Sequence, residues 1–142
     1  MNQKKLNADL INLAEKRIHI NSLNYSDEAY DEAEDQLHEA EDAFLSQYGD
    51  YLENVLDDIH EKHCSGTDVL IATAYIAKNY VRMDESLDGE PRYEIKSKEG
   101  VIVEADKYPG KITRMVLVPS PARIILTVNG KAKDILWTMP SN

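Results

Sequence analysis

Apolar side chains recur every three to four residues through the first third of the chain, a spacing typical of helices with one buried face. Residues 3–20 and 27–48 each carry such a stripe, and a short polar connection at 21–25 separates them. The second stripe has small residues at alternate positions, which lets two helices approach closely. The sequence therefore predicts an antiparallel helical hairpin, with Ser26 as the N-cap of its second helix. The stripes are Leu6, Leu10, Leu13, Arg17 and Ile20, then Tyr30, Ala33, Leu37, Ala40 and Phe44.

Two further helices are expected between Gly49 and residue 81. Gly49 either terminates the second helix or lies within a kink. Asp50 and Glu53 have the spacing of a capping box, which favours a fresh helix that ends near Cys64. The segment 69–81 is apolar almost all round and contains three alanines, so it predicts a buried helix, with a buried strand as the alternative.

The pattern changes to strands after a loop at 83–91. Asn129 and Gly130 form the strongest hairpin signal of the chain. A two-residue turn there would set aliphatic side chains beside lysines, whereas a three-residue loop would set Ile125 opposite Ile135. We therefore expect the longer loop, which includes Lys131. The expected strands are at about 92–97, 101–106, 112–118, 122–128 and 132–138.

The 142 residues fit a single domain with one core. The predicted fold is α+β: about four N-terminal helices, a helical hairpin plus two more, packed on a C-terminal, mostly antiparallel sheet of four to five strands. The domain 1–142 would comprise a helical region over residues 1–82, the loop 83–91 and a β region over residues 92–142.

The net charge of −10 comes from one segment. Residues 26–64 contain fourteen acidic residues and Lys62, a balance of −13, whereas the flanking regions are close to neutral. Such a field repels phosphates, so nucleic acid and anionic membranes are not expected as partners. Cys64 is the only cysteine, and the first residues lack the apolar run of a secretory signal. These features predict a soluble cytoplasmic protein.

One group of side chains has metal-ligand chemistry. Its members are spaced four, three and four residues apart along one side of the third predicted helix, and zinc and related metals prefer such ligands. A tetrahedral site would need further ligands, such as His38 or His19. The alternative hypothesis is structural, with His60 and Lys62 offsetting the helix dipole in its last turn. Because no partner motif accompanies the group, we expect no resident metal. The group comprises Glu53, Asp57, His60 and Cys64.

Other catalytic arrangements fit less well. The spacings Asp35-x-x-His38 and Asp57-x-x-His60 depart from a carboxylate-bridged di-metal motif, which uses glutamate. The acidic surroundings of Cys64 oppose a reactive thiolate. No phosphate-binding loop, nucleophile elbow or dinucleotide fingerprint occurs.

The acidic helix itself is the remaining candidate. Its carboxylates either keep the protein soluble or form a docking surface for a basic partner. The narrow seams and the tyrosines also suggest a homodimer. We therefore expect a small non-enzymatic protein that acts through protein–protein contacts, by self-association or by binding a basic partner. The alternative is a metal-dependent or small-molecule-binding enzyme that uses the Glu53–Cys64 group.

Overall fold

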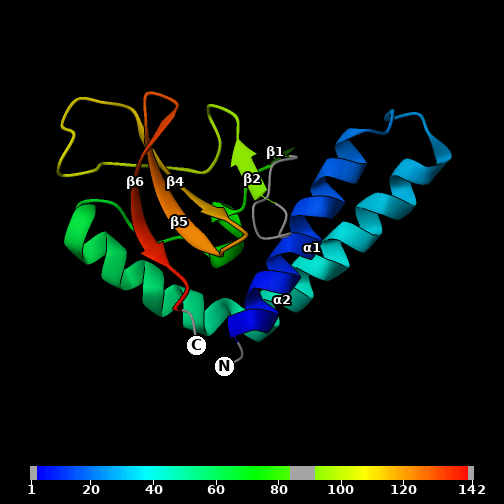
Figure 1. Cartoon of the computed structure of the whole chain (residues 1–142), viewed down its shortest axis with the longest axis horizontal. Helices are drawn as coiled ribbons and strands as arrows, with labels where there is room; N and C mark the ends of the chain where they lie inside the picture. The colour runs from blue at the N-terminus through cyan, green and yellow to red at the C-terminus, as the bar shows by residue number, and fades with distance from the viewer. Residues whose placement is uncertain (1–2, 84–91, 141–142) are drawn as a thin grey trace.

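The computed structural model describes residues 3–83 and 92–140, and the fold is α+β. The described residues form two long helices, a short 3-10 helix and six strands, so the prediction of about four helices was wrong in number (Figure 1). Of the loop predicted at 83–91, Met83 is the last residue of a strand, and residues 84–91 lie outside the described residues. The elements are α1 (Gln3–Asn21), α2 (Glu28–His63), η1 (Ala72–Tyr75), β1 (Tyr80–Met83), β2 (Arg92–Ile95), β3 (Val101–Val103), β4 (Thr113–Val118), β5 (Arg123–Val128) and β6 (Lys131–Thr138).

Helices α1 and α2 lie side by side and run in opposite directions, as a hairpin (Figure 1). Leu10 and Leu13 of α1 are buried, as are Leu37 and Phe44 of α2, so both stripes form the seam. The N-cap is Asp27 rather than Ser26, and its side chain accepts a hydrogen bond from the N–H of Ala29 at 3.1 Å. A carboxylate at this position satisfies a free N–H and also interacts favourably with the helix dipole.

The helix α2 continues through Gly49, so the predicted fresh start at Asp50 was wrong. Its axis changes direction near its middle, so the first half pairs with α1 and the second half runs beneath the sheet (Figure 1). Tyr48, Leu52 and Leu56 are each only 1% exposed, one turn apart on either side of Gly49. This continuous burial stabilises the helix where the local capping signal favours an end.

The predicted helix at 69–81 was also wrong. Only Ala72–Tyr75 is helical, and it is a 3-10 turn, while Tyr80–Met83 is a strand that begins within the segment predicted to be helical. Ile76 forms a parallel bridge with Leu117 of β4, so this segment follows the edge of the sheet. Tyr75, Ile76 and Ala77 are buried, whereas Leu70 and Ile71 are exposed, and periodicity alone does not distinguish such a path from a helix.

The strands form two antiparallel sheets. The hairpin β1–β2 stands apart from a four-stranded sheet of order β3-β4-β5-β6. The five predicted strands all exist within a few residues of their expected ends, but 92–97 pairs with β1 instead of joining the larger sheet.

The turn between β5 and β6 has two residues, so the three-residue loop was wrong. Asn129 (φ 51°) and Gly130 (φ 85°) both have the positive φ of a type I′ turn. Val128 then pairs with Lys131, yet Ile125 still pairs with Ile135 as expected. A bulge between Leu126 and Thr127 shifts the register by one residue. The apolar pattern therefore sets the register through a bulge and not through the turn.

One face of the four-stranded sheet packs on the second half of α2. Leu126 of β5 and Met115 of β4 are buried in the core to which this helix also contributes, and Trp137 of β6 meets Tyr51 of α2 edge to face at 6.3 Å between ring centroids. None of the helices in the described ranges is long and apolar enough to cross a membrane.

Candidate functional site

The four predicted metal-ligand residues differ in exposure. Glu53 and Asp57 are exposed on α2, whereas His60 is 3% exposed and Cys64 is fully buried. Within residues 3–83 and 92–140, no three His, Cys, Asp or Glu side chains form a group that could hold a metal ion.

His60 is held by hydrogen bonds at both ring nitrogens. Its Nδ1 lies 2.8 Å from the carbonyl oxygen of Thr67, and its Nε2 lies 2.9 Å from the hydroxyl of Tyr75. A carbonyl only accepts, so Nδ1 carries the proton and Nε2 accepts from the tyrosine. Metal coordination at His60 would therefore break a buried hydrogen bond.

Cys64 is the C-cap of α2, and its N–H donates to the carbonyl of His60 at 2.8 Å. Burial, together with the negative charge of Asp106, raises the pKa of the Cys64 thiol to about 11. A thiol that stays protonated at neutral pH is a poor nucleophile and a poor metal ligand. His60 and Cys64 therefore fit a structural role better than metal binding or nucleophilic catalysis.

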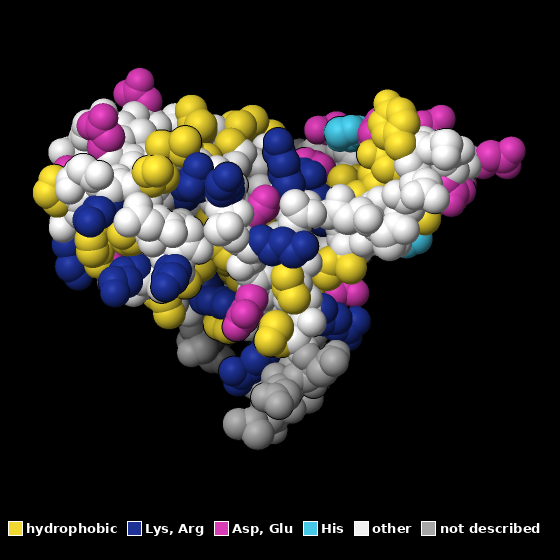
Figure 2. Space-filling model, turned by 90° about the horizontal axis from the view of Figure 1, so that it is seen from above, with side chains coloured by type: hydrophobic (Ala, Val, Ile, Leu, Met, Phe, Trp, Pro, Cys, Tyr) yellow, Lys and Arg dark blue, Asp and Glu magenta, His cyan; other side chains and the backbone are white. Residues whose placement is uncertain are grey.

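The feature that stands clear of the sheet is the far end of the helical hairpin (Figure 1). We define the acidic arm as residues 22–43, the turn after α1 and the first half of α2. It holds nine acidic residues and neither lysine nor arginine. Figure 2 shows acidic side chains gathered at the end of the arm and many lysine and arginine side chains over the rest of the molecule. The nine acids are Asp27, Glu28, Asp31, Glu32, Glu34, Asp35, Glu39, Glu41 and Asp42.

Seven of these nine carboxylates are exposed, all but Glu34 and Glu41. Among the ion pairs of the described residues, only that of Glu41 involves the arm. Glu28 and Glu32 lie one turn apart, as do Asp31 and Asp35. Each such like-charge pair destabilises a helix by roughly 0.2–0.5 kcal/mol. The arm therefore carries a negative field that the chain itself does little to neutralise.

An aromatic pair lies at the tip of the arm. Tyr25 is 85% exposed, and its ring packs on that of Tyr30 with centroids 5.1 Å apart. Exposed aromatic faces beside carboxylates suit arginine, which can pair with the acids and stack on the rings.

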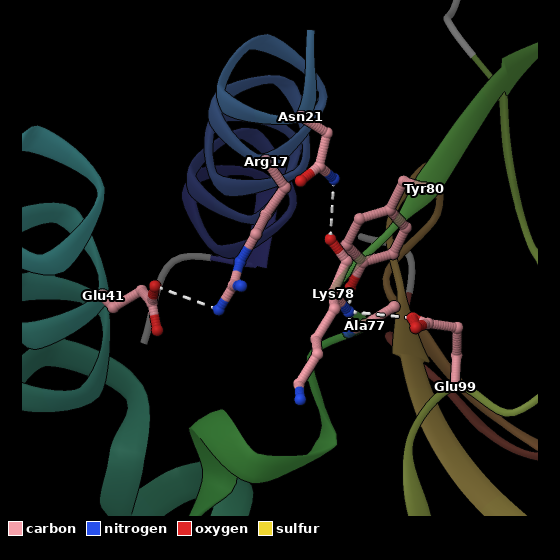
Figure 3. Close-up of polar contacts among 7 residues, drawn as sticks. All are labelled: Arg17, Asn21, Glu41, Ala77, Lys78, Tyr80 and Glu99. Atoms are coloured by element: carbon pink, nitrogen blue, oxygen red, sulfur yellow. Dashed lines mark hydrogen bonds and ion pairs between the residues drawn. The ribbon is translucent and has the colours of Figure 1, made fainter. Parts of the chain in front are cut away.

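An ion pair between α1 and α2 fixes the base of the arm. Arg17 of α1 donates from Nη2 to Oε1 of Glu41 at 3.1 Å, and both side chains are about one-fifth exposed (21% and 17%). Figure 3 shows the guanidinium lying between the helices. In the described residues, Nε of Arg17 is buried without a hydrogen-bond partner. The pair therefore fixes the hairpin at the cost of one unsatisfied donor.

A second contact joins this base to the β region. Asn21 donates from Nδ2 to the carbonyl of Lys78 at 3.0 Å, and Oε2 of Glu99 accepts from the N–H of Lys78 at 2.9 Å (Figure 3). The same oxygen of Glu99 also accepts from the N–H of Asn79 at 3.1 Å. Tyr80 donates to the carbonyl of Leu117 at 2.7 Å and accepts from the N–H of Ala77. This network orients the arm relative to the sheets.

Sequence reasoning identified the acids of the arm but missed the anchors at its base. Glu99 is only 8% exposed, and its partners are backbone N–H groups about twenty residues away. No local pattern reveals a buried acid of this kind. Comparison of the chain with models of known protein families, with curated proteins and with solved structures finds no match.

Proposed function

We propose that the protein acts through protein–protein contacts, and that its acidic arm binds a basic, arginine-bearing protein. One observation carries the proposal: an arm that stands clear of the sheet carries seven exposed carboxylates and, at its tip, a tyrosine pair of which Tyr25 is 85% exposed and Tyr30 is partly buried. The carboxylates would steer the partner toward the arm, and the rings of Tyr25 and Tyr30 would hold its guanidinium groups.

The rigid attachment of the arm supports a docking role. The ion pair of Arg17 with Glu41 and the hydrogen bonds of Asn21 restrict motion at its base. A surface that is already ordered loses less conformational entropy on binding than a flexible segment does.

A different protein fits the arm better than a second copy of this chain. Two copies each carry a net charge of −10 and repel one another at long range, whereas a basic protein is attracted. Self-association is a separate outcome that sedimentation velocity of the protein alone would detect. A single, buried cysteine agrees with the reducing cytoplasm, where we place the interaction.

Charge-matched variants test the proposal. The probe is a short peptide of alternating arginine and glycine, titrated onto the labelled protein at low and high salt. Asp31→Asn/Asp35→Asn removes two charges from the arm. Glu53→Gln/Asp57→Asn removes two charges from exposed positions of the same helix beneath the sheet, so the net charge of the two variants is equal.

The proposal predicts salt-sensitive binding that weakens more in the arm variant than in its charge-matched control, and that weakens again in Tyr25→Ala. Equal losses in the two double variants would mean that the peptide responds to net charge alone and would contradict a docking role for the arm.

A further inference from the structure

A cleft lies in the β region of the molecule, lined by residues of α1, β1, β2, β5, β6 and the turn before β5. Its volume is about 940 Å³, within the range of sites that hold small organic ligands. Side chains of opposite character line it, including two arginines, one glutamate and several apolar residues. Those used below are Met83, Arg92, Glu94, Pro121, Arg123 and Ile135.

Arg123 is held by neutral groups. Its Nη1 donates to the carbonyls of Pro119 and Pro121 at 2.9 and 3.0 Å, and its Nη2 lies 3.4 Å from the carbonyl of Tyr93. Carbonyl oxygens fix the guanidinium without neutralising it. Burial lowers the pKa of Arg123, and repulsion by the nearby charge of Arg92 lowers it further, whereas the charge of Glu94 acts in the opposite direction. An anion in the cleft would relieve that repulsion.

Arg92 supplies a second guanidinium and Glu94 a carboxylate. They are two residues apart on β2, so they share a face of that strand. Neither forms an ion pair among the described residues. Two cations and one anion give the cleft a local balance of +1.

The apolar lining limits the kind of molecule that fits. Ile135 is 64% exposed and Met83 is 38% exposed, although both belong to strands. With Pro121 they form an apolar surface beside the charged groups, which an apolar substituent would cover.

We infer that this cleft binds a small organic molecule with one carboxylate and an apolar body. Paired guanidinium groups match a carboxylate through bidentate hydrogen bonds. A singly charged carboxylate is neutralised by the local balance of +1, whereas a doubly charged phosphate would leave one negative charge uncompensated and would lose more hydration on entering the cleft. The site is separate from the acidic arm, so it does not depend on the proposed function.

A purely structural role is the alternative for Arg123, because its bonds to Pro119 and Pro121 brace the turn before β5. Arg92 is exposed and makes no such bond in the described residues. Replacing Arg92 therefore tests ligand binding without removing a hydrogen bond that braces the fold.

The experiment is a titration followed by the backbone amide resonances of the full chain. Phenylacetate is the probe, and phenylacetamide and phenyl phosphate are its neutral and doubly charged counterparts. The variant Arg92→Gln removes one guanidinium, and Lys111→Gln is the matched control, an exposed cation outside the cleft lining.

The inference predicts saturable shifts at Tyr93, Glu94 and Arg123 with phenylacetate, weaker binding of both counterparts, and an affinity about tenfold lower in Arg92→Gln, as expected for one lost charge-assisted hydrogen bond. Lys111→Gln should bind like the unmodified protein. No saturable shift, equal binding of the neutral amide, tighter binding of phenyl phosphate, or unchanged affinity in Arg92→Gln would each overturn it.

Discussion

The Nε2 atom of His60 lies 2.9 Å from the hydroxyl of Tyr75, and both side chains are buried. The hydroxyl also accepts the N–H of Leu70 at 3.2 Å, while Nδ1 of His60 faces the carbonyl of Thr67. Two side chains thus satisfy backbone groups of the loop that links α2 to η1. A residue with metal-ligand chemistry acts here as a structural connector, because every polar atom it brings into the core has a partner.

Removing the Tyr75 hydroxyl should destabilise the protein. Tyr75→Phe leaves Nε2 of His60 and the N–H of Leu70 without their partner, at a cost of about 1–3 kcal/mol in the free energy of unfolding. Chemical denaturation measures it. Tyr25→Phe is the control, since that ring is 85% exposed, and it should change the value by less than about 0.5 kcal/mol. Equal stability of both variants would show that the buried pair contributes nothing.

The ion pair at the base of the arm should behave as a partly buried one. Glu41→Ala leaves the Arg17 guanidinium without its partner and should cost roughly 1–3 kcal/mol. Adding Arg17→Met to that variant should restore some of the loss. Asp42→Ala, an exposed neighbour outside the ion pairs of the described residues, should cost less than about 0.5 kcal/mol. A double variant less stable than Glu41→Ala would contradict this account of the pair.

Cys64 should be unreactive in the folded protein. Its burial and raised pKa, about 11, keep it a protonated thiol at pH 8. A thiol-specific reagent should therefore label it slowly in the native state and rapidly in denaturant. Native labelling as fast as that of the unfolded chain would contradict the observed burial.

Stability should fall in alkali. Burial raises the pKa of the phenols of Tyr48, Tyr80 and Tyr93, and for Tyr48 and Tyr93 the carboxylates of Asp9 and Glu15 raise it further. In the unfolded chain these groups ionise near pH 10 and Cys64 near pH 9.0. Because the folded state holds these protons more tightly, the stability is complete below pH 9 and decreases as pH rises above it.

Absorbance of tyrosinate checks that prediction. Of the eight tyrosines, Tyr48, Tyr80 and Tyr93 should ionise only as the protein unfolds. A single smooth titration of all eight, with circular dichroism unchanged, would be the contrary result.

The presence of a helix was predictable where the apolar periodicity was strong, but the residues at which helices begin and end were not. The stripe from Tyr30 to Phe44 identified the hairpin, because those residues pack on the adjacent helix. The capping signal at Asp50 failed because the burial of Leu52 and Leu56 against the sheet outweighs a local preference. At 69–81 the bridge between Ile76 and Leu117 is a contact between distant segments, which no local pattern contains.

The β region shows how two local signals can conflict. The Asn129-Gly130 pair favours a two-residue turn, while the apolar pattern favours the pairing of Ile125 with Ile135. A two-residue turn in a regular hairpin does not give that pairing. Both are satisfied, because a bulge before Thr127 absorbs one residue. Such a bulge depends on the pairing of strands across the sheet, so the sequence of the turn does not predict it.

The candidate sites divide in the same way. The acidic arm could be predicted, because its carboxylates are close together in the sequence of one predicted helix. The cleft could not, because Arg92 and Arg123 lie on different sheets and meet only through the fold. The network of Glu99 with Lys78 and Asn79 was hidden for the same reason.

The most direct test of the acidic arm as a docking surface is a map of amide resonance changes when the Arg-Gly peptide binds. The account predicts changes concentrated in residues 22–43, including Tyr25 and Tyr30, that fade as salt is raised. Changes centred on residues 53–64 or on the four-stranded sheet, with the arm unaffected, would contradict it.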